Sequence, residues 1–179
     1  MLDEKVAVYL KEDEKNVQNQ DYELATAKDK KEILELYRSQ LGREFCPWTE
    51  QYPTEREIDF DLAHDALLIK RDENGAIIAA ISLDMDEVVE SLDCWSKDLA
   101  PGKEVARLAV KVECQNRGLA QEMLKCAIHE IQKRGYKSIH FLVNKYNEKA
   151  LRSYSHLHFS KVGEIFLFEQ PFYCYEKEI

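Results

Sequence analysis

One short segment carries most of the information in this chain: Gln115-Asn116-Arg117-Gly118-Leu119-Ala120. It lies between an apolar run at Val105–Val112, which is typical of a β-strand, and an amphipathic pattern at Leu119–Arg134, which is typical of an α-helix. The first N–H groups of a helix have no partner within it, and the helix dipole places partial positive charge there. Because Gly118 has no Cβ, a ligand could approach this backbone closely. The segment therefore predicts a phosphate-binding turn.

Patterns on both sides of this turn predict a mixed sheet with helices. Before it, the expected strands are 22–27, 66–70 and 76–83, the last two joined by a hairpin at 72–75, and the expected helices are 28–40 and 54–64. After it, a helix is expected to begin at Asn147, and the expected strands are 138–143, 161–168 and 172–176. The strand, helix and strand across 105–143 predict a parallel crossover, whereas the two closing strands are expected to be antiparallel. The predicted fold class is α/β, with a mixed sheet flanked by helices.

Composition narrows the kind of protein. The 179 residues are 45% hydrophobic and 33% charged, which fits one globular domain over 1–179. A net charge of −9 argues against binding to nucleic acid, whose backbone attracts clustered lysine and arginine. No apolar run is long enough to span a membrane, and the N-terminus lacks a signal-peptide pattern, so we expect a cytoplasmic protein without a membrane partner. The five cysteines and five histidines are scattered and predict no metal site.

Two motifs in this chain resemble those of the GCN5-related N-acetyltransferase (GNAT) superfamily. The family's acetyl-CoA signature is Arg or Gln, two variable residues, Gly, one variable residue, then Gly or Ala, and the segment 115–120 matches it. The family's Asn, Ala and Tyr on the next helix correspond to Asn147, Ala150 and Tyr154. The resemblance covers 22–177 and implies a GNAT-like acyl-CoA N-acyltransferase fold, with 1–20 as an N-terminal extension or an extra strand. One departure is His158, which stands where the family often has a glycine.

The resemblance implies that acetyl-CoA is the cosubstrate and that no metal is needed. In the family the turn binds the pyrophosphate of coenzyme A, and the preceding strand pairs with the pantetheine amides. Asn147 corresponds to a residue that bonds the pantetheine arm, and an asparagine there is also a good helix N-cap. The implied cofactor-binding residues are Leu108, Ala109, Val110, Gln115, Asn116, Arg117, Gly118, Leu119, Ala120 and Asn147.

Two residues are catalytic candidates by the same resemblance. Tyr154 corresponds to a tyrosine that protonates the departing thiolate, which a phenol can do because its pKa, about 10, exceeds that of a thiol, about 8.5. Its ring could instead simply pack on the sheet. Glu104 corresponds to a general base in histone-modifying members, but it could instead be a solvated glutamate beside Lys103. Arg107 could face the acceptor or pair with an acidic neighbour.

Aromatic side chains are expected to border the acceptor. Trp48, Tyr52 and Trp95 lie in segments that cover the acceptor site in the family. Aromatic walls suit an apolar or cationic acceptor, although these residues could also only pack a loop. A nearby acidic run could attract an amine or could form a solvated surface; it contains Asp84, Asp86, Glu87, Glu90 and Asp93. The implied acceptor is an amine of a small molecule or a peptide.

The resulting hypothesis is an acetyl-CoA-dependent N-acetyltransferase in which the amine attacks the thioester directly. A backbone N–H near Val110 would polarise the thioester carbonyl. Relatives often form dimers, so the resemblance also allows a homodimer. Two alternatives use the same turn: a CoA-binding sensor or scaffold without turnover, and a nucleotide-binding α/β protein that takes ATP or NAD.

Overall fold

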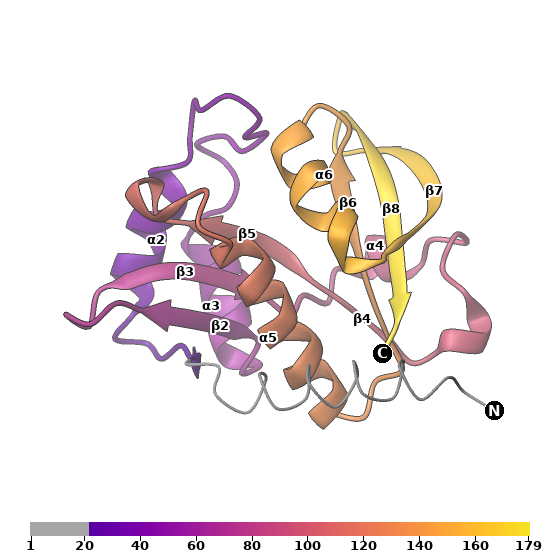
Figure 1. Ribbon diagram of the computed structural model, residues 1–179, viewed down its shortest axis with the longest axis horizontal. Helices are drawn as coiled ribbons and strands as arrows, with labels where there is room; N and C mark the ends of the chain where they lie inside the picture. The colour runs from indigo at the N-terminus through magenta and orange to yellow at the C-terminus, as the bar shows by residue number, and fades with distance from the viewer. Residues whose placement is uncertain (1–21) are drawn as a thin grey trace.

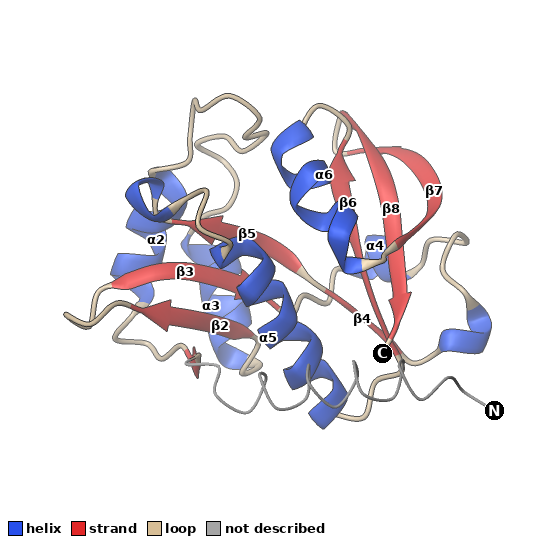
Figure 2. Ribbon diagram, in the orientation of Figure 1, coloured by secondary structure: helices blue, strands red, loops and turns tan. Residues whose placement is uncertain are grey.

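The computed structural model describes residues 22–179 (Figure 1). The extension expected at 1–20 lies outside the described residues. Two four-stranded sheets and their helices follow one another in the order that the sequence patterns predict (Figure 2). The predicted class, a mixed α/β fold, is therefore confirmed.

The first sheet is antiparallel and has the order β1-β2-β3-β5. Its strands are β1 (Glu23–Leu24), β2 (Leu67–Arg71), β3 (Ile77–Ser82) and β5 (Ala106–Val110). The predicted hairpin joins β2 to β3. In its turn, the Asp72 carboxylate accepts hydrogen bonds from the amides of Asn74 and Ala76, and Gly75 has a φ of +83°. Because glycine tolerates this left-handed conformation, the Asn-Gly pair places the turn correctly.

Helices cover both faces of the first sheet. α2 (Lys30–Arg38) and α3 (Glu55–Ala63) pack on one face, and α5 (Leu119–Lys133) crosses the other (Figure 1). The predicted capping box begins α3, with Thr54 and Glu57 bonded reciprocally. Each helix turns an apolar stripe to the sheet, so one cluster of buried side chains forms under α5 and another under α2 and α3.

The second sheet has the order β4-β6-β8-β7. β4 (Gly102–Glu104) is parallel to β6 (Ser138–Asn144), whereas β8 (Gln170–Glu178) is antiparallel to both β6 and β7 (Ser160–Leu167), as predicted for the closing strands. The acidic segment before β4 contains a short helix, α4 (Glu87–Glu90). Single 3-10 turns occur at Lys97–Leu99, Val112–Cys114 and Ser155–Leu157.

The strand predicted at 105–112 is observed as β5 alone, Ala106–Val110, so its predicted bounds are too wide, and the sequence does not predict the separate strand β4 that precedes it. β4 ends at Glu104, β5 begins at Ala106, and the backbone bulges at Arg107, whose φ is +51°. The register between β3 and β5 shifts at the same place. The parallel crossover consequently involves β4 and β6 only, while β5 pairs with β3, and β5 and β6 part from each other (Figure 1). A bulge bends a strand without changing its apolar pattern, which is why the sequence does not reveal it.

α6 (Glu148–Tyr154) follows β6 beside this gap (Figure 1). Asn147 begins the helix as predicted, because its side-chain oxygen accepts a hydrogen bond from the Ala150 amide at 3.0 Å. After the 3-10 turn that follows α6, His158 has φ +56° and ψ +38°. The histidine therefore adopts the left-handed conformation in which glycine is usual at a helix end.

Candidate active site

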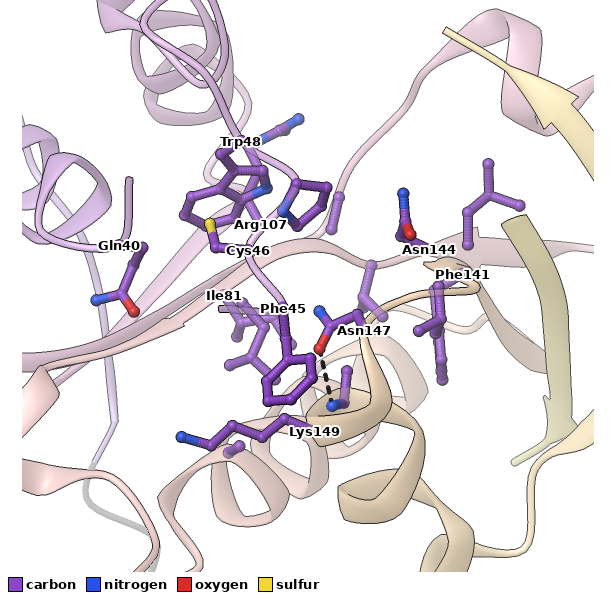
Figure 3. Close-up of a pocket in the computed structure, with 18 of the residues that line it drawn as sticks. Gln40, Phe45, Cys46, Trp48, Ile81, Arg107, Phe141, Asn144, Asn147 and Lys149 are labelled. Carbon is purple, nitrogen blue, oxygen red and sulfur yellow. Dashed lines mark hydrogen bonds between the residues drawn. The ribbon is translucent and has the colours of Figure 1, made fainter. Parts of the chain in front are cut away.

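A cavity of about 1570 Å³ opens where β5 and β6 part. Its walls come from the loop at 42–53, β5, the first turn of α5, the start of α6 and the turn between β7 and β8. Figure 3 shows side chains around it, among them Trp48 from the loop, Phe141 from β6 and Asn147 at the start of α6. Most of the predicted site residues line this cavity, so the fold brings together what the sequence disperses over a hundred positions.

The turn before α5 forms one end of the cavity. Asn116 and Gly118 both have left-handed backbone conformations, with φ of +60° and +84°. Gly118 is the N-cap of α5, and within the described chain no side chain caps this helix start. A Cβ at Gly118 would meet open space. The amides at this helix start thus remain accessible to an anionic ligand.

The Gln115 side chain holds this turn from inside. Its amide nitrogen donates to the Gln40 side-chain oxygen at 3.1 Å and to the Val110 carbonyl at 2.9 Å. Its oxygen accepts from Lys149 Nζ at 2.6 Å and from Arg43 Nη2 at 3.3 Å. Gln115 thereby links the segments around α2 and α6 to the end of β5, a role that the motif alone does not predict.

The backbone of β5 presents a hydrogen-bond donor to the gap. The Lys111 amide donates to the Ile78 carbonyl at 2.8 Å. Bonds in an antiparallel ladder alternate along the strand, so the N–H and C=O of Val110 point away from β3. The carbonyl accepts from the side chains of Gln40 and Gln115. The Val110 N–H therefore faces the gap between the two sheets.

Tyr154 lies at the end of α6 and lines the cavity. Its ring meets that of Phe141 edge to face, with centroids 5.2 Å apart. Burial raises the pKa of the Tyr154 phenol above its ordinary value. Tyr154 thus both packs on the sheet and borders the cavity, and its phenol is protonated at neutral pH, as a proton donor must be.

Glu104 lines the cavity from the end of β4. It is only 4% exposed, so the alternative of a solvated glutamate is wrong. The Asp86 amide donates to its Oε2 at 3.3 Å. Burial, reinforced by the charge of Asp84, raises the pKa of Glu104 well above its ordinary value. A carboxyl group with such a pKa can take up and release protons closer to neutral pH.

The bulge in β5 places the Arg107 side chain in a buried ionic cluster. Its Nη1 donates to Asp84 at 2.6 Å and to the Tyr52 hydroxyl at 3.1 Å. Its Nη2 donates to Asp61 and to the Ser82 hydroxyl, both at 2.9 Å. Of the two roles that the sequence left open, the structure shows the pairing with acidic neighbours, and Arg107 also lines the cavity.

Asp61 is a member of this cluster that sequence patterns do not single out. It lies on α3 and is fully buried, and its burial raises the pKa of its carboxyl group despite the nearby guanidinium. An acidic residue on an amphipathic helix normally faces solvent. The bulge directs Arg107 toward α3 and gives this carboxylate a buried, positively charged partner.

Two of the three predicted acceptor-side aromatic residues line the cavity. Trp48 and Tyr52 are contributed by the loop at 42–53. Trp95 lies elsewhere, since its ring stacks on that of His140 with centroids 4.5 Å apart. Trp95 therefore lies apart from Trp48 and Tyr52, with which it was predicted to border the acceptor.

Two predicted cofactor-binding side chains also lie away from the cavity. Alternation along β5 places Leu108 and Val110 on the cavity wall and buries Ala109 in the cluster under α2 and α3. The side chain of Arg117 is exposed and does not line the cavity.

Basic and acidic side chains lie at opposite ends of β5. Arg43 and Lys149 meet at Gln115, beyond the C-terminal end of the strand. Asp84 and Glu104 lie with Arg107 at its N-terminal end. One end of the cavity thus suits an anion, and the other suits a cation. Within 22–179, no group of three or more His, Cys, Asp or Glu side chains could hold a metal ion, and no helix is long and apolar enough to cross a membrane.

Comparison with known structures shows the same fold in many acetyltransferases. An acetyltransferase of the GNAT family from Streptococcus agalactiae 2603 is 17% identical, with 89% of this chain and 95% of that chain covered and a TM-score of 0.72. A ribosomal-protein-alanine N-acetyltransferase from Brucella melitensis is 14% identical, with coverages of 88% and 99% and a TM-score of 0.68. A chain of the NatC complex bound to Gag peptide and CoA is 17% identical, with coverages of 88% and 97% and a TM-score of 0.68.

At these identities the structural similarity establishes the fold. A comparison with curated proteins found no match. The sequence itself matches the model of the acetyltransferase (GNAT) family over residues 30–159, a range that runs from the first residue of α2 to the end of α6 and beyond His158. The chain therefore belongs to the acetyltransferase (GNAT) family.

Proposed function

We propose that this chain is an acetyl-CoA-dependent N-acetyltransferase that acts on an amine of a small molecule or a peptide, with 22–177 as its catalytic domain. The observation that carries the proposal is the cavity between β5 and β6, which joins an uncapped helix start to a buried carboxylate. Family membership supports the type of reaction. The structural neighbour described as bound to a peptide and CoA supports this pair of ligands.

The residues at the anionic-ligand end fit acetyl-CoA. Phosphate groups are bound well by an open helix start with a glycine at the N-cap, and Arg43 and Lys149 add positive charge beside it. The Val110 N–H facing the gap is suited to an amide or thioester carbonyl of the same ligand. We assign phosphate binding to 115–120 and the pantetheine contact to β5 and Asn147.

We assign a group of this chain to each step of acetyl transfer. Glu104, directly or through water, takes a proton from the amine, whose nitrogen forms a bond to the thioester carbon. The Val110 N–H stabilises the negative charge that develops on the carbonyl oxygen. Tyr154 gives its proton to the sulfur as the carbon–sulfur bond breaks. The products are the acetylated amine and the free thiol.

Calorimetric titration with acetyl-CoA tests this proposal. We expect the wild-type protein to bind and Gly118→Glu to lose binding, because the new carboxylate repels phosphate at the helix start. Gly135→Glu is a matched control, since Gly135 has the same φ of +84° and the same open surroundings near the other end of α5. Both substitutions strain the backbone equally, and only the first lies at the cavity.

Thiol release in the presence of a panel of amines then tests turnover. A folded wild-type protein that does not bind acetyl-CoA would contradict the whole proposal and favour another phosphate ligand. Tight binding without transfer to any amine would instead favour a CoA-binding sensor or scaffold.

A further inference from the structure

The acceptor end of the cavity holds more negative than positive charge. Asp84, Asp86 and Glu104 all line it. Asp84 and Glu104 are almost fully buried, and the Asp86 backbone amide donates to Glu104. A buried charge interacts more strongly than one in water, so these carboxylates favour a cation in the adjoining space.

Arg107 has no hydrogen-bond donor left with which to bind a negatively charged group of a ligand. A guanidinium has five N–H donors. The four on Nη1 and Nη2 are used by Asp84, Tyr52, Asp61 and Ser82. The fifth, on Nε, is buried and has no partner among the described residues, so a ligand in the cavity cannot reach it. Arg107 consequently has no donor available to hold a carboxylate of the acceptor.

Apolar and aromatic side chains supply part of the remaining surface at this end. Met85, between the two aspartates, is 44% exposed. Tyr52 and Phe60 also line the cavity and are 40% and 41% exposed. In the view of Figure 3, Trp48 and Arg107 lie toward the top of the pocket and Lys149 at its bottom. Arg56, in the first turn of α3, also lines the cavity, but it is exposed and is not a member of the buried cluster.

We propose that the acceptor is a primary amine on an apolar or aromatic carrier, with no carboxylate beside the amine. This inference rests on the proposed function, because it concerns the acceptor of the same reaction. A carboxylate next to the amine would approach Glu104 and Asp84 without a free donor on Arg107 to compensate, whereas the ammonium group alone would be attracted. Free amino acids are therefore excluded as acceptors, and amines or peptide N-termini without that charge are accepted.

The matched pair 2-phenylethylamine and phenylalanine tests this, because the two differ by one carboxylate. Binding of each is measured by calorimetry on the protein with and without saturating coenzyme A, so that the result does not depend on turnover. We expect 2-phenylethylamine to bind at least about ten-fold more tightly. Asp86→Asn should reduce this ratio several-fold, and asparagine keeps the N-cap of α4. Asp98→Asn, an exposed change on the same segment but outside the cavity, should leave the ratio unchanged.

Glu104→Gln is a second, nearly isosteric variant, and we expect it to reduce the preference for 2-phenylethylamine over phenylalanine to the same extent. Equal binding of the two compounds, tighter binding of phenylalanine, or binding of neither would overturn the inference. Failure of the proposed function is a separate observation, because it would appear as absent acetyl-CoA binding or absent transfer while the preference between the two compounds remains.

Discussion

The guanidinium of Arg107 and the carboxylate of Asp61 lie 2.9 Å apart, and both side chains are buried. Their contact joins α3 to the bulge of β5, and Asp84, two residues after β3, contacts the same guanidinium. Three charges in a dry environment depend on one another, because removing one leaves the others buried without compensation. The cluster is therefore both a wall of the cavity and a support of the bulge that opens it.

Replacing Arg107 by methionine is expected to lower the free energy of unfolding by about 3–5 kcal/mol, since it leaves two buried carboxylates unpaired. Arg71→Met is the control. Arg71 also contacts several carboxylates, among them Asp29 at 2.6 Å, but its side chain is 29% exposed, so water screens its charge and we expect a smaller loss than at Arg107. Urea unfolding of both variants measures the difference. Equal losses in the two proteins would contradict the structural role given to Arg107.

Glu104→Gln is expected to stabilise the protein more at high pH than at low pH. The pKa of Glu104 is raised in the folded state. Its contribution to stability is therefore fully present below the pKa of an unfolded glutamate, about 4.3, and is lost as the pH rises through the folded value. Glutamine does not titrate, so the variant should gain in Tm over the wild type between pH 5 and pH 8. Thermal melts at both values check this, and a pH-independent difference would show that Glu104 titrates normally.

Tyr154→Phe is expected to lower kcat for acetyl transfer by about 100-fold or more while leaving the Kd for acetyl-CoA nearly unchanged, because it removes the proton donor but not the ring. Tyr175→Phe is the control, since Tyr175 also stacks on Phe141, with centroids 5.9 Å apart, but does not line the cavity. Thiol-release kinetics and calorimetry separate the two effects. An unchanged kcat in Tyr154→Phe would assign the proton to another donor.

His158→Gly is expected to raise the free energy of unfolding by up to about 1 kcal/mol. The left-handed conformation of His158 costs a residue with a Cβ about 1–2 kcal/mol, and the greater backbone freedom of glycine in the unfolded chain offsets part of the gain. The side chain is exposed, so few contacts are lost. Urea denaturation measures the change, and a destabilised glycine variant would mean that the His158 side chain has a structural role of its own.

The parts of the fold with local signals could be predicted from the sequence. The Asn74-Gly75 turn, the capping box at Thr54 and the cap at Asn147 each depend on residues within a few positions of one another. Family motifs likewise pointed to Gly118 and Tyr154, both of which line the cavity.

The features that depend on contacts distant in sequence could not be predicted. The bulge at Arg107 takes its shape from pairing with β3 and from Asp61, which lies 46 positions away. Glu104 is buried only because the segment around Asp86 folds over it. Trp95 lies in a segment that was predicted to cover the acceptor, yet its ring packs on that of His140. No local pattern records these partners.

The division of the central strand also has a thermodynamic consequence. Glu104 is the last residue paired with β6, Ala106 is the first paired with β3, and the Val105 amide still donates to the His140 carbonyl. The two sheets therefore share little backbone hydrogen bonding, and they can differ in local stability. A molecule that bonds to both β5 and α6 adds a connection that the chain lacks. Its binding should make unfolding more cooperative, so that amide hydrogens in both sheets exchange at a common, slower rate.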